Sequence, residues 1–66
     1  MDYAVAELEE AQRQIASVLH KLQASLDAMQ NRADAGKLKS QITLAQRRIK
    51  AFTLANALIE KAMSRP

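Results

Sequence analysis

The sequence predicts an all-α protein, an antiparallel two-helix hairpin that resembles a coiled coil and turns near Gly36. Apolar residues recur at alternating spacings of three and four on both sides of Gly36, the only glycine in the chain. This spacing keeps side chains on one face of a helix. Two such patterns on either side of a lone glycine therefore indicate two helices that pack against each other. With 66 residues there is room for a single domain, residues 1–66.

The first helix is expected over about residues 2–34. Asp2 is a good N-cap residue, and strong helix formers follow without proline or glycine. Gly36 can take the left-handed conformation that ends many helices, and Asn31 and Asp34 add turn character before it. The apolar seam of this helix consists of Val5, Leu8, Ile15, Leu19, Leu22, Leu26 and Met29.

The second helix is expected over about residues 38–64. Its seam consists of Leu38, Ile42, Ala45, Ile49, Phe52, Ile59 and Met63. Reflecting the chain about a turn between Ala35 and Gly36 places apolar residues opposite one another, for example Met29 opposite Ile42. The register is therefore consistent with the spacing in both helices.

Two polar residues interrupt the seams in adjacent layers. Gln12 is expected opposite Ile59, and Asn56 opposite Ile15. Both could be partly solvated near the open end of the hairpin. Alternatively, a hydrogen bond between them could fix the register at some cost in stability, as seam asparagines do in coiled coils.

The second helix carries more apolar surface than one seam can bury. A second apolar stripe lies beside the seam: Leu44, Ala51, Leu54, Ala55, Leu58 and Ala62. Seam and stripe together cover more than half of the circumference of the helix. The first helix has a milder version, in which Ala4, Ala11 and Val18 flank its seam. Scattered aliphatic residues are normal on surfaces, but these share one side, so we predict a partner-binding surface.

Composition points to association as well. A core of this size usually contributes only ~3–5 kcal/mol of stability. The chain has no cysteine and one histidine, His20, so it can build neither a disulfide framework nor a structural zinc site. The acidic N-terminus does not resemble a signal peptide, and no apolar stretch approaches the ~20 residues that span a bilayer. We therefore expect a soluble, cytoplasmic protein.

Charge is unevenly distributed along the chain, whose formal net charge is +3. Acidic residues gather in the first ten positions. Basic residues gather around and after the glycine: Arg32, Lys37, Lys39, Arg47, Arg48 and Lys50. These charges suit a solvated surface or a basic end that meets an acidic partner. The group Arg47, Arg48 and Lys50 could contact phosphates, but no aromatic platform accompanies it, so nucleic-acid binding is disfavoured.

The sequence offers no catalytic constellation. Ser17 and Asp27 do not lie at spacings that would assemble a triad with His20 on one rigid helix. Glu7, Glu9 and Glu10 belong to an exposed turn, where little would shift a carboxyl pKa. We expect no enzyme, no cofactor, no metal and no membrane partner.

Several features together resemble a family of small co-chaperones in type III secretion systems. They are Leu8-Glu9-Glu10, the spacing of Leu19, Leu22 and Leu26, a glycine turn followed by Lys37, and the segment 51–59. The resemblance implies a cytoplasmic protein that pairs with a larger helical-repeat chaperone and helps to keep the needle subunit unpolymerised. The stripe on the second helix would then be the partner-facing surface. The alternative is a homodimeric four-helix bundle, either a structural module or an RNA-binding regulator.

Overall fold

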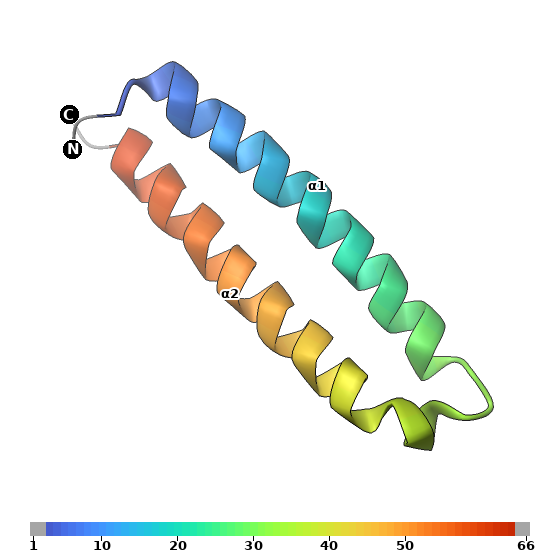
Figure 1. Ribbon diagram of the computed structural model, residues 1–66. Coiled ribbons are helices and arrows are strands. Elements are labelled where there is room, and N and C mark those ends of the chain that lie inside the picture. Colours follow the sequence, from blue (N-terminus) through green and yellow to red (C-terminus); the bar gives the residue numbers. More distant parts are fainter. Residues whose placement is uncertain (1–2, 65–66) are drawn as a thin grey trace.

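Two long helices lie side by side and run in opposite directions (Figure 1). The structure is a computed structural model and describes residues 3–64. Helix α1 spans Val5–Gln30, a short 3-10 helix spans Ala35–Leu38, and helix α2 spans Lys39–Met63. The molecule is a rod with extents of 50 × 15 × 14 Å. The prediction of an all-α helical hairpin is confirmed.

Helix α1 begins without a side-chain cap. Ala4 is extended, with φ −68° and ψ 150°, and its carbonyl oxygen accepts hydrogen bonds from the backbone N–H groups of Glu7 and Leu8, at 3.0 and 3.1 Å. Glu7 lies in the first turn, where its negative charge is favourable beside the positive end of the helix dipole. The predicted N-cap, Asp2, lies outside the described residues.

The turn differs from the expectation in two ways. Helix α1 ends at Gln30 rather than near residue 34, and Gly36 does not adopt the left-handed conformation, since no residue between 3 and 64 has a positive φ. Instead, the chain tightens into the 3-10 helix, in which the N–H of Lys37 donates to the carbonyl oxygen of Asp34 at 2.9 Å. Arg32 and Asp34 form a two-bond ion pair across the turn, at 3.0 Å for each bond.

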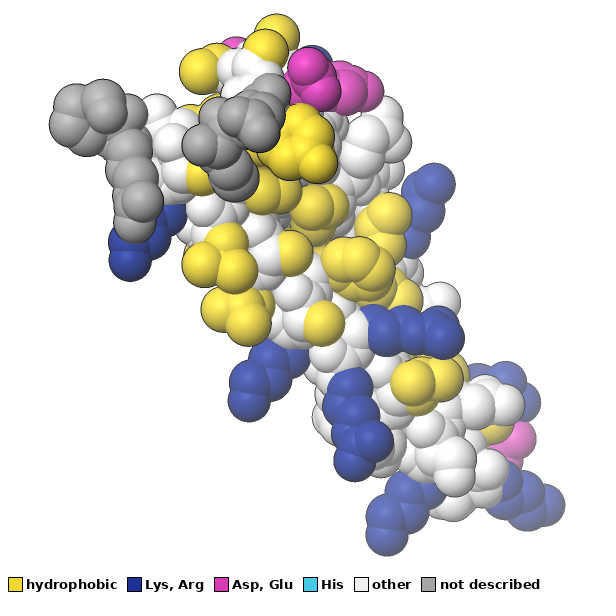
Figure 2. All heavy atoms as spheres, turned by 60° about the vertical axis from the view of Figure 1, so that its left-hand side comes forward, with side chains coloured by type: hydrophobic (Ala, Val, Ile, Leu, Met, Phe, Trp, Pro, Cys, Tyr) yellow, Lys and Arg dark blue, Asp and Glu magenta, His cyan; other side chains and the backbone are white. Residues whose placement is uncertain are grey.

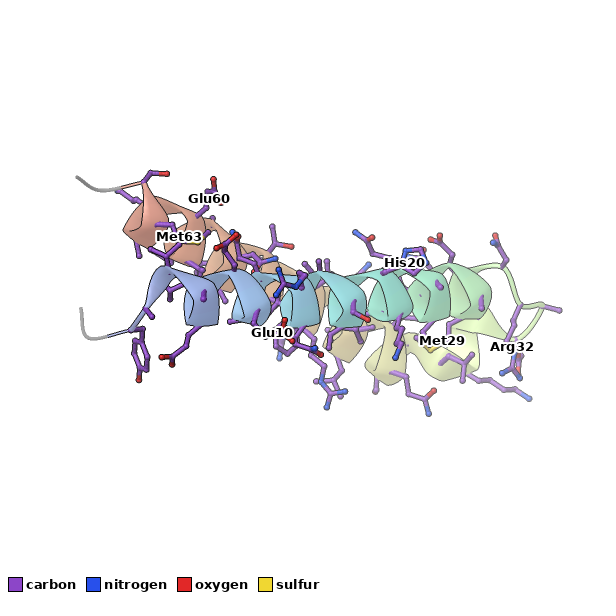
Figure 3. The ribbon with its side chains drawn as sticks, turned by 90° about the horizontal axis from the view of Figure 1, so that it is seen from above. Glu10, His20, Met29, Arg32, Glu60 and Met63 are labelled. Atoms are coloured by element: carbon purple, nitrogen blue, oxygen red, sulfur yellow. The ribbon has the colours of Figure 1, made fainter. Side chains whose placement is uncertain are left out.

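The interior is a single seam between the helices. Every predicted seam residue except Val5 is at least half-buried, while Val5 is 56% exposed. Among the described residues, Ala45 alone is fully buried, at 7% exposure. The helices also cross, since α2 lies above α1 at the open end and below it near the turn in Figure 3. Two crossing cylinders can cover only the strip where they touch, so the seam stays partly open to solvent.

Gln12 and Asn56 do contact each other, through backbone oxygens rather than side chain to side chain. The Asn56 side-chain amide donates to the backbone oxygen of Gln12 at 3.4 Å, and Gln12 Nε2 donates to the backbone oxygen of Asn56 at 3.5 Å. Gln12 Nε2 also donates to the Glu60 carboxylate at 2.9 Å. These bonds tie α1 to α2 near the open end.

Candidate protein-binding surface

The residues of the predicted stripe differ in how deeply they are buried. Leu44, Leu54 and Leu58 are 48%, 61% and 60% exposed. Ala51 is exposed too, whereas Ala55 and Ala62 are half-buried where α2 meets α1. We call these six residues the α2 face. The α2 face therefore extends from the edge of the seam to the solvent-exposed side of α2.

The α2 face continues onto α1. Val18 is 40% exposed and Ala11 half-buried. Ala4, Ala11 and Val18 recur every seven residues, so they follow one side of α1 next to its seam. Small side chains at such positions allow another helix to approach closely.

A shallow hollow lies between the helices, where the α2 face meets the adjoining side of α1. Its volume is about 240 Å³, and it is lined by Leu22, Ser25, Met29, Gln41, Leu44, Ala45 and Arg48. Leu44 is a predicted site residue, Arg48 belongs to the basic group noted in the sequence, and the three other apolar residues were predicted for the seam. Ser25 and Gln41 were not predicted, because apolar periodicity marks only apolar residues. The hollow confirms that residues 22–29 lie beside residues 41–48, in agreement with the predicted register.

On the face that Figure 2 shows, apolar and basic side chains are unevenly distributed along the rod. In Figure 2, where the left-hand side of Figure 1 comes forward, hydrophobic side chains gather over the half with the open end. Most Lys and Arg side chains surround the half with the turn. Arg47, Arg48 and Lys50 are exposed there, and Phe52, the one aromatic residue of α2, is half-buried in the seam. The basic half therefore offers phosphates charge but no stacking surface.

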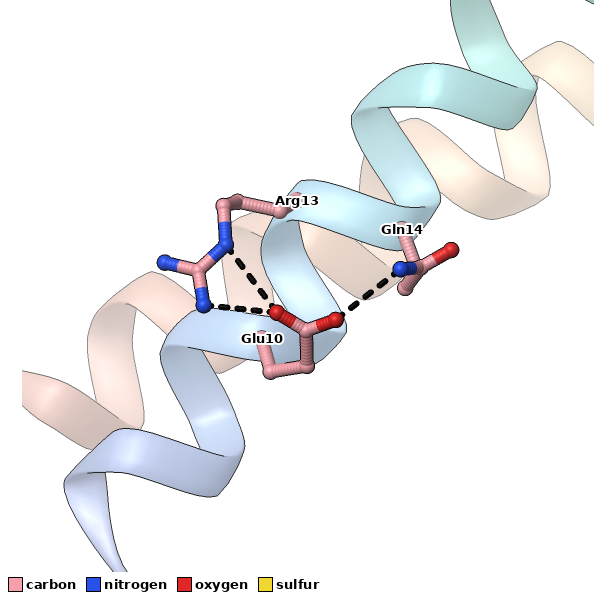
Figure 4. Close-up of polar contacts among 3 residues, drawn as sticks. All are labelled: Glu10, Arg13 and Gln14. Atoms are coloured by element: carbon pink, nitrogen blue, oxygen red, sulfur yellow. Dashed lines mark hydrogen bonds and ion pairs between the residues drawn. The ribbon is translucent and has the colours of Figure 1, made fainter.

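Glu10 lies in a cluster of polar contacts on the surface of α1. Gln14 Nε2 donates to Glu10 Oε1 at 2.9 Å, and the Arg13 guanidinium donates to Glu10 Oε2 at 2.6 and 3.0 Å (Figure 4). The hydrogen bond from Gln14 and then the bonds and charge of Arg13 lower the pKa of Glu10 below its usual value. A carboxylate held in its ionised form by its neighbours is a poorer base than a free one.

Other kinds of site find no support in the described part of the chain. His20 is exposed (Figure 3), and residues 3–64 contain no group of three or more His, Cys, Asp or Glu side chains that could hold a metal ion. Within the same residues, no helix combines the length and the apolar character needed to cross a membrane. Comparisons with protein-family models, curated proteins and solved structures gave no match.

Proposed function

We propose that this hairpin acts by binding another protein through the α2 face. The observation that carries the proposal is the exposure of three leucines, Leu44, Leu54 and Leu58, along one side of a helix. Full burial of a leucine side chain contributes roughly 1.5–3 kcal/mol. Leu44, Leu54 and Leu58 retain about half to three-fifths of their exposure, so covering all three would contribute roughly 2.5–5 kcal/mol to association. Clustering on one side of a helix makes them a candidate binding surface, which single scattered leucines are not.

We further propose a co-chaperone role within a heteromeric complex. The support is the resemblance to the small co-chaperones of type III secretion, in length, in hairpin form and in the surplus apolar surface of the second helix. On this proposal, a larger helical-repeat chaperone covers the α2 face in the cytoplasm, and the pair keeps a needle subunit unpolymerised. The hairpin contributes contact surface and no chemistry.

The test compares two double variants of the tagged chain, expressed in its native host. Leu54→Asp/Leu58→Asp places two carboxylates on the α2 face. Thr53→Asp/Ala57→Asp places the same charges on neighbouring exposed positions of α2, each about 100° around the helix from the leucine that directly follows it. Co-purifying proteins are identified by mass spectrometry, and helicity is checked by circular dichroism.

The proposal predicts that the control retains a helical-repeat protein and a small secreted subunit, and that the leucine variant loses both while remaining helical. Equal recovery of both proteins by the two variants would show that the α2 face does not bind them. Loss of helicity in the leucine variant alone would show that Leu54 and Leu58 belong to the core. Recovery of no such pair by the unmodified chain would overturn the co-chaperone role.

A further inference from the structure

We propose that a second copy of this chain covers the α2 face when no other protein is bound. The two hairpins would form an antiparallel four-helix bundle whose two-fold axis passes by Ala51. This inference rests on the proposed function because it uses the same face. It adds a regulatory step, since a partner would have to displace one copy before it could bind.

The first argument is the exposed area. A compact folded protein of 7.3 kDa exposes roughly 4,200 Å². This chain exposes 5266 Å², an excess of about 1,100 Å². A stable interface of standard size buries about 800 Å² on each partner. The excess is therefore large enough for one such interface on each copy, and the α2 face, with the adjoining side of α1, is where apolar residues accumulate.

The second argument is the symmetry of the α2 face itself. A two-fold interface requires a surface that is complementary to itself. Leu44, Ala51 and Leu58 are spaced by seven residues and lie in one row, with a small residue in the middle and a leucine at each end. A two-fold axis at Ala51, perpendicular to α2, maps this row onto itself. Each Leu44 then packs against Leu58 of the other copy, and the two Ala51 methyl groups allow close approach of the helices.

The third argument selects the antiparallel arrangement. If the two rods packed in parallel, their turns would lie side by side, with the basic residues Arg32, Lys37 and Lys39 of both copies together. Like charges at close range oppose association. The antiparallel arrangement places the turns at opposite ends of the bundle.

The absence of cysteine makes this geometry directly testable. Ala51→Cys places a thiol on the proposed axis. Ala57→Cys is the matched control, because Ala57 is also an exposed alanine of α2 but lies about 120° around the helix from Ala51. A disulfide requires Cα atoms within about 7 Å. Under mild oxidation, the Ala51 variant should form a covalent dimer at concentrations at which the Ala57 variant stays uncross-linked.

A second pair of variants measures the same contact without cross-linking. Ala51→Glu sets two carboxylates against each other on the axis, whereas Ala57→Glu adds the same charge elsewhere on α2. Light scattering over a concentration series should give twice 7.3 kDa for the unmodified chain and for Ala57→Glu. For Ala51→Glu the dissociation constant should rise by about 100-fold or more, since like charges in an interface cost several kcal/mol.

The outcomes separate this inference from the proposed function. An unmodified chain that stays at 7.3 kDa up to about millimolar concentration would overturn the homodimer, and the capture experiment on the leucine variants would still decide the proposed function. A dimer that cross-links in the Ala57→Cys variant but not in the Ala51→Cys variant would overturn the inference and would also place the association surface away from the α2 face. Cross-linking at Ala51 together with dissociation by Ala51→Glu supports it.

Discussion

At the scale of single residues, the least satisfied part of the seam is its polar layer near the open end. The two bonds that join Gln12 and Asn56 are 3.4 and 3.5 Å long, at the weak end of hydrogen-bond distances. Asn56 Oδ1 is buried and accepts no hydrogen bond. A buried acceptor without a donor costs free energy that a satisfied or apolar group would not. The polar layer formed by Gln12 and Asn56 therefore lowers the stability of the hairpin, whether or not it also fixes the register of the two helices.

We predict that Asn56→Leu raises the free energy of unfolding by about 1–2 kcal/mol, because it removes the unpaired acceptor and adds apolar contact in the seam. Urea denaturation measures the change. Thr53→Leu, at an exposed position, is the control and should alter stability by only a few tenths of a kcal/mol. A less stable Asn56→Leu protein would contradict the prediction. If the protein is stabilised and its mass in solution is unchanged, Asn56 has no role in specificity.

At the scale of elements, the connection between the helices is a tight 3-10 turn instead of a left-handed glycine cap. Gly36 sits inside the 3-10 helix, and a Cβ atom at this position would meet nothing within 4 Å. Since Gly36 has no positive φ, the conformational freedom of glycine is not used in the folded state. It still enlarges the entropy of the unfolded chain, which opposes folding.

Gly36→Ala should therefore stabilise the protein by about 0.4–1 kcal/mol, since alanine restricts the unfolded chain and fits the observed backbone. Thermal or urea unfolding of the variant beside the unmodified chain measures the difference. Ala33→Gly, three residues earlier in the turn that precedes the 3-10 helix, is the reverse change and should lower stability. Destabilisation by Gly36→Ala would mean that residue 36 uses a left-handed conformation in solution.

At the scale of the whole molecule, the rod has a long surface and a thin interior. With one fully buried residue among those described and a seam that is otherwise half-buried, apart from the exposed Val5, a lone hairpin retains little hydrophobic stabilisation. Any copy or partner that covers the α2 face adds to stability by mass action. Folding and association of this chain should consequently be coupled.

Thermal unfolding should reveal this coupling. We predict that the Tm of the unmodified chain rises when its concentration increases from about 10 µM to about 1 mM, because binding to the folded state alone shifts the equilibrium. Circular dichroism at the two concentrations measures it. The Tm of the Ala51→Glu variant should be lower and nearly independent of concentration. A Tm of the unmodified chain that does not change with concentration would indicate a monomer that folds on its own.

The sequence by itself determined the two helices, their seams and the exposed leucines of α2, because burial on one side of a helix leaves a period in the sequence that can be read directly. It predicted that Gln12 and Asn56 occupy adjacent layers, and left open whether they bond. Only the tertiary structure decided that they bond through backbone oxygens, that α1 ends at Gln30, and that Gly36 lies in a 3-10 turn. The reason is geometric: two packed helices fix the distance that the connection has to span, and the conformation of a turn follows from that distance as well as from its residues.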